Sequence, residues 1–366
     1  MEKRKKMMSR FESIGAYFPE KIVKTQELID SLKNRPDIDL ERITGIKTRY
    51  MREEGEDSFT MALAAAKDCL RNSEYEAADL DVIINTAITR FDDGLKFVID
   101  PPISLKLKKA LGANQAINFD LTNACAGMMS GVQILDNMIR AGVIKNGMVI
   151  SGECITPITD TAIKEIEEGI DPQFASLTVG DSGVAIIIDS SHDNNEGIEG
   201  IDLTTFAKFS ELCYGMPSDK NPGVAMYTDA IGIHAAALGK LPSYTEKMML
   251  REGYKISDFD YVIPHQTSVK AIKMGFEAIR KQLNARKDEI PEVLISVNEY
   301  GNTSSTAVMV TLYKALKEKT FKPNSRVVFL ALASGLVLGF IVAKIGNLKI
   351  KEKIQIPEEK IIDMVV

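Results

Sequence analysis

The sequence predicts an α/β fold built from two similar layered halves. Short apolar runs rich in β-branched residues alternate with stretches of helical periodicity, a pattern typical of sheets covered by helices on both faces. Two stretches also resemble later parts of the chain at nearly the same spacing. With 366 residues, 45% of them hydrophobic and 26% charged, the chain is long enough for about two domain-sized units with buried cores.

The expected strands and helices follow from these patterns. The helical period of 3.6 is visible, for example, in the spacing of Leu135, Met138 and Ile139. We expect buried strands at Val82–Ile88, Met148–Ser151, Val184–Ile188, Tyr261–Ile263, Leu294–Val297 and Val327–Leu332. We expect helices at Phe59–Arg71, Gly131–Ala141, Asp229–Gly239, Val269–Gln282 and Ser305–Lys317.

The stretch Val327–Ala343 is nearly as long and apolar as a membrane-spanning helix, which needs about 18 to 20 residues. Gly335 and Gly339 interrupt this stretch, and Val, Ile and Phe are frequent in it. These features favour two buried strands joined by a tight turn. We therefore expect no membrane span.

The internal repeat indicates a duplicated half. The run DLDVII from Asp79 resembles DFDYVI from Asp258, which begins 179 positions later. The run NFDLTNACAG resembles the later run ISVNEYGNTS, and a helix and a strand follow each of them. The offset between these two runs is 177, which aligns Asn302 with Cys125. Two such halves are expected to pack with pseudo-twofold symmetry, so that equivalent loops meet where the chemistry takes place.

We place the boundary between the halves in the polar, turn-rich stretch from Asp189 to Gly197. The first half then covers residues 1–190 and carries the candidate nucleophile, and the second half covers residues 198–346. Residues 347–366 lack clear periodicity and are expected to form a peripheral tail.

Charge and cysteine usage disfavour several classes of function. A net charge of −6 gives no electrostatic reason for nucleic-acid binding. The four cysteines never form a CxxC pair and there are three histidines, so we expect no metal site. The chain also lacks a glycine-rich nucleotide motif, so we expect no cofactor. The basic run MEKRKKMM leads into polar residues and not into an apolar segment, so we expect no secretory signal and a cytoplasmic, reducing location.

Cys125 is the candidate nucleophile. It lies in the run NACAG, after the strand-like NFDL and before an amphipathic helix, so its thiol is expected at a strand-to-helix turn. Exposed N–H groups and the positive end of a helix dipole favour a thiolate at such a turn. The alternative is a buried structural cysteine. That is the interpretation for Cys69, Cys154 and Cys213, which lack this context.

His265 and Asn302 are the candidate partners of the nucleophile. His265 ends the strand-like run YVIPHQ, at the kind of strand end where open α/β sheets bind ligands. A core histidine is the alternative, and we assign His192 and His234 to that class. Asn302 lies in YGNTS, the second half's version of the cysteine turn, where an amide can donate a hydrogen bond to an oxyanion without titrating. A helix N-cap is the alternative for Asn302.

The run GDSG at Gly180–Gly183 matches a string found in serine proteases. All three histidines follow Ser182, and the chain is not all-β, so a protease of that type is disfavoured. We expect this run to form the turn into the strand VAIII.

Three motifs in order, NACAG around Cys125, VIPHQTSVKAI around His265 and YGNTSS around Asn302, resemble the β-ketoacyl-acyl-carrier-protein synthase III family of the thiolase superfamily. The likeness extends from IGAYFP and ITGIKTRY to ASGLVLG, which is nearly the whole chain except the tail. It implies the thiolase fold, with duplicated αβαβα layered halves related by pseudo-twofold symmetry.

The resemblance also implies a Claisen condensation. Cys125 would take an acyl group from a thioester, and His265 and Asn302 would hold the carbonyl of a second thioester as its α-carbon becomes a carbanion. The backbone N–H groups of Cys125 and Gly335 would form the oxyanion hole for acyl transfer. Acyl-CoA or acyl-carrier-protein thioesters would be the substrates, and the enzyme would be a homodimer.

Two departures from the family pattern concern the substrate. The run ALASGLVLG replaces the usual GGG string, although Gly335 remains. Asp100 stands where family members carry an apolar residue that reaches into the partner subunit. A carboxylate there resembles a subgroup that joins two acyl-CoA chains or makes pyrones and cyclic diones, with this acid from the neighbouring subunit as base. A loop aspartate before Pro101 is the alternative.

Four basic residues after His265 align roughly with the carrier-docking patch of the family, and a solvated helix face is the alternative for them. They are Lys270, Lys273, Arg280 and Lys281. The tryptophan and arginine with which family members clamp the CoA adenine are replaced by Asp39 and Ile43, and Arg42 is only adjacent. We therefore expect any CoA recognition to use other residues.

The expected function is that of an acyltransferase of the synthase III type, which condenses the acyl group on Cys125 with a second thioester such as malonyl-carrier protein in fatty acid or polyketide-like biosynthesis. The first alternative is a non-decarboxylative condensation of two acyl-CoA molecules with Asp100 as base. The others are a non-catalytic partner subunit and an acyltransferase of the hydroxymethylglutaryl-CoA synthase type.

Overall fold

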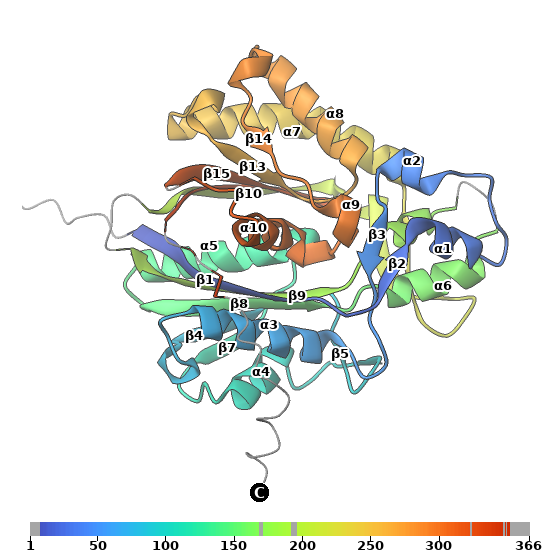
Figure 1. Ribbon diagram of the computed structural model, residues 1–366, viewed down its shortest axis with the longest axis horizontal. Helices are drawn as coiled ribbons and strands as arrows, with labels where there is room; N and C mark the ends of the chain where they lie inside the picture. Colours follow the sequence, from blue (N-terminus) through green and yellow to red (C-terminus); the bar gives the residue numbers. More distant parts are fainter. Residues whose placement is uncertain are drawn as a thin grey trace, which may run out of the picture.

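The computed structural model describes residues 8–167, 171–191, 196–322, 324–346, 348 and 350–351. Two five-stranded sheets lie one above the other, with helices outside and between them (Figure 1). Helices α3 (Ser58–Asn72) and α4 (Ile103–Leu111) cover the outer face of the first sheet. Helices α5 (Gly127–Arg140) and α10 (Ala307–Lys317) lie between the sheets. Helices α7 (Ala230–Glu252) and α8 (Val269–Gln282) cover the outer face of the second sheet. This five-layer arrangement confirms the predicted fold class.

The first sheet contains both parallel and antiparallel strands. Its order is β1 (Met8–Tyr17), β9 (Ser182–Ser191), β8 (Asn146–Glu153), β4 (Val82–Asn85) and β7 (Ile117–Asp120). Strand β4 pairs in parallel with β7 and β8, whereas β9 pairs antiparallel with β8 and β1.

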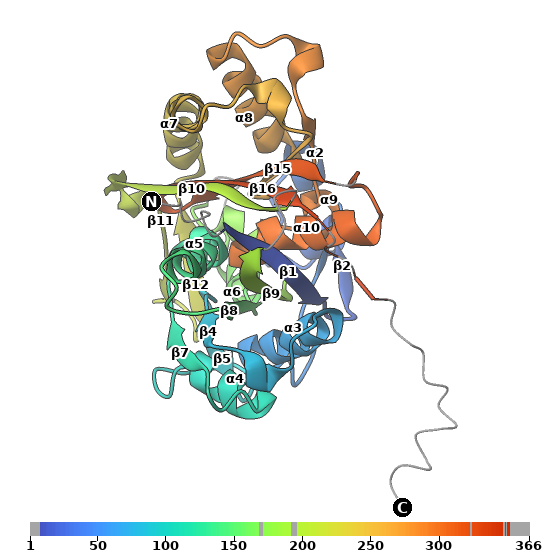
Figure 2. The same cartoon turned by 90° about the vertical axis from the view of Figure 1, so that its left-hand side faces the viewer.

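The second sheet repeats this topology strand for strand. Its order is β10 (Gly197–Phe209), β16 (Gly335–Ile345), β15 (Ser325–Ala333), β13 (Tyr261–Pro264) and β14 (Glu292–Val293). Strand β13 is parallel to β14 and β15, and β16 is antiparallel to β15 and β10. The view from the side shows the two sheets with one helix layer between them and one on each outer face (Figure 2).

Smaller elements connect the layers, and several of them gather on the right-hand side of Figure 1. The short strands are β2 (Ile22–Lys24), β3 (Thr48–Tyr50), β5 (Phe91–Asp92), β6 (Lys96–Phe97), β11 (Cys213–Pro217) and β12 (Val224–Thr228), and the short helices are α1 (Thr25–Asp30), α2 (Leu40–Thr44), α6 (Pro157–Glu165) and α9 (Val297–Tyr300). Two single turns of 3-10 helix, η2 (Ala124–Ala126) and η7 (Ser304–Thr306), lead directly into the central helices.

Most of the predicted elements are present, and the apolar stretch near the C-terminus forms the hairpin β15–β16. Within the described residues, no helix has the length and apolar character needed to cross a membrane. His192 and residues 352–366 of the predicted tail lie outside the described residues.

Three predictions need correction. Leu294–Val297 is not a strand, because the Gln266 side chain accepts hydrogen bonds from the backbone N–H groups of Ser296 and Val297 and draws this segment out of the sheet. Helix α7 continues past Gly239 and through Pro242 to Glu252. The central helices begin 180 positions apart, so the alignment of Asn302 with Cys125 at an offset of 177 is wrong by three positions.

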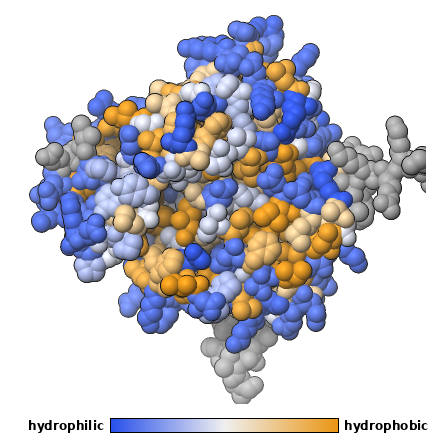
Figure 3. Space-filling view, turned by 180° about the vertical axis from the view of Figure 1, so that it is seen from behind, coloured by the Kyte–Doolittle hydropathy of each residue, from blue (hydrophilic) through white to orange (hydrophobic). Residues whose placement is uncertain are grey.

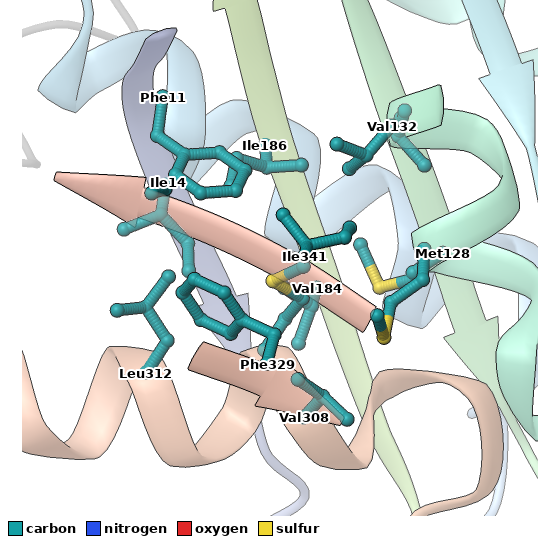
Figure 4. Packing of buried hydrophobic residues seen from close by; sticks show 14 of the residues in the cluster. Phe11, Ile14, Met128, Val132, Val184, Ile186, Val308, Leu312, Phe329 and Ile341 are labelled. Carbon is teal, nitrogen blue, oxygen red and sulfur yellow. The ribbon is translucent and has the colours of Figure 1, made fainter. Parts of the chain in front are cut away.

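The largest apolar core lies around the two central helices. Figure 4 shows Ile14 and Ile186 from the first sheet, Phe329 and Ile341 from the second, and Leu312 from α10 pointing toward one another. All five side chains are fully buried, which contributes about 1.5–3 kcal/mol for each. This packing holds the starts of α5 and α10 in a fixed relation.

Candidate active site

The candidate nucleophile lies where the two halves meet. Cys125 occupies the turn η2 in front of α5, and the equivalent turn η7 in front of α10 packs against it. The Cys125 sulfur lies 3.9 Å from the hydroxyl oxygen of Ser304. Ala124 and Ser304 occupy matching positions and both have positive φ, at 46° and 59°. The structure therefore places Cys125 at the predicted strand-to-helix turn, facing the corresponding turn of the other half.

The surroundings of Cys125 favour the protonated thiol. Burial raises its pKa to about 12, and the charges of Cys213 and Glu153 act in the same direction. The hydrogen bond from Ser304 and the backbone N–H of Cys125 itself lower it. At neutral pH the thiol is therefore neutral in the free protein, and forming a thiolate depends on the groups that stabilise charge at the start of α5.

Asn302 is held by backbone hydrogen bonds to the other half. Its N–H donates to the carbonyl of Thr178 at 2.9 Å, and its carbonyl accepts from the N–H of Gly180 at 3.1 Å. Gly301 before it has φ 68°, and a Cβ there would lie 3.0 Å from the Thr178 carbonyl oxygen, so a side chain at this position is excluded. The Asn302 backbone is thus fixed by a short parallel bridge between the halves.

The Asn302 side chain has a defined orientation. Its Oδ1 accepts a hydrogen bond from the backbone N–H of Ser304 at 3.0 Å. Because the oxygen is engaged, the amide nitrogen is the group left to donate to a ligand. This is the orientation that stabilising an oxyanion requires.

His265 directly follows the last residue of strand β13 in the second sheet. Its backbone N–H donates to the Leu330 carbonyl at 2.7 Å, and the residue is buried with Nδ1 unpartnered. Burial lowers the pKa of the ring to about 4, so the imidazole is neutral at neutral pH. A neutral ring can donate one hydrogen bond to a substrate oxygen without carrying a charge into the core.

Gly335 completes the set of residues expected next to Cys125. It begins β16 after the turn at Ser334, and both β15 and β16 pack against η2. Its φ of 130° is a conformation that side chains rarely adopt, which explains why glycine remains where the surrounding GGG string does not.

Sequence analysis missed a buried polar cluster beside this site, formed by Glu153, Ser151 and Ser305. The Glu153 carboxylate accepts hydrogen bonds from the N–H groups of Ile88 and Thr89 and from the hydroxyls of Thr89, Ser151 and Ser305. Burial raises its pKa despite these donors. An offset of 180 would have identified Ser305 as the counterpart of Cys125.

Cys213 was predicted to be a structural residue in a loop, but it begins strand β11. Its sulfur accepts a hydrogen bond from Thr228 at 3.3 Å, and its charge contributes to raising the pKa of Cys125. No sequence motif indicated this effect of Cys213 on Cys125, because it depends on how β11, which follows the long strand β10, packs in the fold.

The GDSG run leads into β9 as predicted, but it does not form a turn, because Ser182 and Gly183 already belong to the strand. The Asp181 carboxylate accepts from the N–H groups of Arg52, Ile155 and Thr156, and the Ser182 hydroxyl bonds to that of Thr306 at 2.7 Å. In the described part of the chain no histidine bonds to Ser182. These residues therefore join segments of the fold.

The other predicted site residues lie on the surface or form contacts elsewhere in the chain. Asp100 is exposed between β6 and α4, and no hydrogen bond to the groups around Cys125 is found among the described residues. Lys270, Lys273 and Lys281 are exposed on α8. Arg280 forms an ion pair with Glu277 at 2.6 Å, so its charge is partly neutralised.

Comparisons with known proteins were made for the whole chain. The family model described as 3-oxoacyl-[acyl-carrier-protein] synthase III matches residues 119–206, and the model of its C-terminal part matches residues 249–345. The chain is similar to the β-ketoacyl-[acyl-carrier-protein] synthases III of Granulibacter bethesdensis, with 28% identity over 89% of this chain and 96% of that protein, and of Clostridium novyi, with 27% identity over 90% and 97%.

Solved structures share the fold. The 3-oxoacyl-[acyl-carrier-protein] synthase III of Aquifex aeolicus matches with a TM-score of 0.76 and 24% identity, covering 92% of this chain and all of that chain. A variant of OleA from Xanthomonas campestris with bound lauric acid and lauroyl-CoA matches with a TM-score of 0.80 and 17% identity, covering 93% of this chain and all of that one.

The neutral state of His265 predicts a pH dependence of stability. The His265 ring has a pKa of about 4 in the folded protein and its ordinary value of 6.5 in the unfolded chain. The contribution of the neutral ring to the free energy of unfolding is therefore complete above pH 6.5 and is lost as the pH falls toward 4. Between pH 7 and pH 5 the wild-type protein should lose about 2 kcal/mol of unfolding free energy that a His265→Asn variant does not lose. Urea unfolding at both pH values measures this difference, and equal losses would contradict it.

Proposed function

Because the chain belongs to the 3-oxoacyl-[acyl-carrier-protein] synthase III family of condensing enzymes, we propose that Cys125, His265 and Asn302 carry out a Claisen condensation in it. The chain is an acyltransferase of this type. The residue assignment is supported by the contact between the turns of Cys125 and Asn302. Ser304 joins them, because its hydroxyl contacts the Cys125 sulfur and its backbone N–H donates to Asn302 Oδ1.

In the first step, the Cys125 sulfur attacks the carbonyl carbon of an acyl thioester. The N–H groups of Cys125 and Gly335 stabilise the oxyanion that forms. The C–S bond of the donor then breaks, the departing thiolate takes the thiol proton, and the acyl group remains on Cys125.

In the second step, a malonyl thioester loses carbon dioxide, and its α-carbon becomes the nucleophile. The enolate oxygen accepts hydrogen bonds from the neutral His265 ring and from the Asn302 amide nitrogen. The α-carbon attacks the acyl carbonyl, a carbon–carbon bond forms, and the Cys125 thiolate leaves and regains a proton. Fatty acid synthesis uses this reaction.

Acyl loading and condensation should separate in variants. Incubation with acyl-CoA should add one acyl mass to the peptide that contains Cys125, and Cys125→Ala should abolish this addition. His265→Ala and Asn302→Ala should still load the acyl group, but should each lose about 10²- to 10³-fold in condensation rate, because one oxyanion donor is removed. Intact-protein and peptide mass spectrometry measure loading, and release of labelled carbon dioxide measures condensation. A modified peptide containing Cys213 in place of Cys125 would contradict the assignment.

A homodimer is the second part of the proposal, and the exposed apolar residues of the first half support it. Phe97, Ile99 and Ile117 are 54%, 82% and 57% exposed, on β6, the segment that follows it, and the outer strand β7. Seen from behind, apolar side chains gather on the lower half of the molecule, which contains the first sheet and its helices (Figure 3). Pairing of two copies over this surface would bury these side chains.

The free cysteines fit a reducing compartment such as the cytoplasm.

A second candidate function follows from the position of Asp100. It directly follows the exposed Ile99 on the proposed dimer surface and carries a carboxylate that could act in the partner's site. In that case the base removes a proton from the α-carbon of a second acyl-CoA, and the two acyl groups join without loss of carbon dioxide.

Mixing variants tests this second function. Asp100→Asn and Cys125→Ala proteins should each be inactive with acyl-CoA alone as substrate. After subunit exchange of an equal mixture, about a quarter of the wild-type activity should return, because half of the dimers are hybrids with one complete site. Product formation from two acyl-CoA molecules is measured by mass spectrometry. An unaffected Asp100→Asn protein, or an inactive mixture, would exclude a base from the partner subunit.

The basic residues of α8 are proposed to receive the phosphates of CoA or the acidic surface of a carrier protein. Lys270 and Lys273 are exposed and form no ion pair among the described residues, whereas Arg280 and Lys281 both face Glu277. Helix α2 packs against α8, and Asp39 there caps α2 through the N–H of Arg42 and offers no clamp for an adenine. The free positive charge therefore lies in the first turns of α8.

Charge reversal tests this docking surface. The double variant Lys270→Glu, Lys273→Glu should raise KM for a carrier-bound thioester about tenfold and leave a small thioester without phosphates unaffected, because only the former carries the complementary charge. The matched control is Lys281→Glu, which changes a lysine already close to Glu277. Steady-state rates at low and high salt measure the effect, and equal KM values in both variants would contradict the proposal.

A further inference from the structure

Among the described residues, the Ser304 hydroxyl forms the side-chain hydrogen bond to the Cys125 sulfur, and its role goes beyond that of a turn residue. We propose that the Ser304 hydroxyl positions the Cys125 sulfur and donates a hydrogen bond to it as it becomes a thiolate during acyl loading. This inference rests on the proposed role of Cys125 and adds a positioning residue to it.

The geometry supports a directed contact. The two atoms are 3.9 Å apart, which is within the range of hydrogen bonds to sulfur, and Ser304 is 5% exposed. Among the described residues the hydroxyl has no other hydrogen-bond partner. A hydroxyl shielded from water in this way gains more from bonding to an anionic sulfur than an exposed one would, because the local dielectric constant is low.

The backbone of Ser304 shows why this contact is stable. Its φ of 59° is a left-handed conformation that costs a non-glycine residue about 1–2 kcal/mol. The hydrogen bond from its N–H to Asn302 Oδ1 holds the residue in this conformation. One residue therefore orients the Asn302 amide through its backbone and reaches the nucleophile through its side chain.

The surroundings of Cys125 oppose a thiolate and make this donor necessary. Burial opposes a negative charge on the sulfur most strongly, and negative charges on Cys213 of β11 and Glu153 of β8 oppose it further. Opposing them, the favourable groups are the Ser304 hydroxyl and the N–H of Cys125. Removing the hydroxyl would leave the developing thiolate with one of these two groups.

The chemical step balances without a further reactant. The thiol proton goes to the departing thiolate of the acyl donor, and the sulfur forms its bond to the acyl carbon. Ser304 keeps its own proton throughout, since it acts as a hydrogen-bond donor. The sulfur is neutral while it is acylated, and it becomes a thiolate again when it leaves in the condensation step, so the hydrogen bond acts in both steps.

Three variants test the inference. Ser304→Ala removes the hydroxyl, and Ser304→Gly removes both the hydroxyl and the cost of the positive φ. Thr303→Val is the matched control, because its hydroxyl is buried directly before the same turn and has no hydrogen-bond partner among the described residues. The rate of alkylation of Cys125 by iodoacetamide is followed by mass spectrometry between pH 6 and 10, and acyl loading is followed in a single turnover.

Both Ser304 variants should react about tenfold more slowly than wild type in alkylation and loading, with the alkylation profile shifted to higher pH. Thr303→Val should keep the wild-type profile. Condensation from preloaded acyl-enzyme should also slow in Ser304→Ala, because the Cys125 sulfur leaves as a thiolate in that step, although the backbone N–H of residue 304 still holds Asn302.

Profiles for Ser304→Ala and Ser304→Gly that coincide with wild type would overturn the inference, as would an equal shift in Thr303→Val. If Ser304→Gly were restored to wild-type rates while Ser304→Ala was slow, the backbone conformation would be responsible and the inference would also fail. Alkylation does not need a thioester, so failure of wild-type protein to load acyl groups would count against the proposed function and leave this test intact.

Discussion

The site depends on one contact between the halves, the short parallel bridge between Thr178–Gly180 and Asn302. In the proposed mechanism each half supplies only part of the chemistry, the thiol from the first and the imidazole and amide from the second. The apolar layer around α5 and α10 brings the halves together over a large area, but apolar packing alone does not fix polar groups to within a hydrogen bond. The bridge provides this precision because its two backbone hydrogen bonds set the position of Asn302 directly.

Buried hydroxyl groups extend this connection around the nucleophile. Ser305 bonds across the halves to Ser151 and Glu153, and Thr306 bonds to Ser182. Each of these groups would cost about 1–3 kcal/mol if it were buried without a partner, so the halves have a single favourable register. Burial is the main reason why the Cys125 thiol resists ionisation, and the charge of Glu153 in this cluster adds to that effect.

The sequence was sufficient to predict the layered fold, the hairpin near Gly335 and the turn of Cys125, because hydrophobic periodicity and an internal repeat carry that information. It was not sufficient for the contacts between the repeats. The repeat was aligned at 177 positions, whereas the helix starts are 180 apart, so Ser304 and Ser305 were not matched with Ala124 and Cys125. The proximity of Cys213 to the site depends on how β11 packs, and no local pattern records it.

A crystal structure of the protein after reaction with an acyl thioester tests the central claim most directly. The account predicts an acyl group on the sulfur of Cys125, its carbonyl oxygen within hydrogen-bond distance of the Cys125 and Gly335 N–H groups, and the His265 ring and Asn302 amide nitrogen facing the same carbonyl carbon. An acyl group on another side chain, or a carbonyl oxygen directed away from both N–H groups, would contradict it.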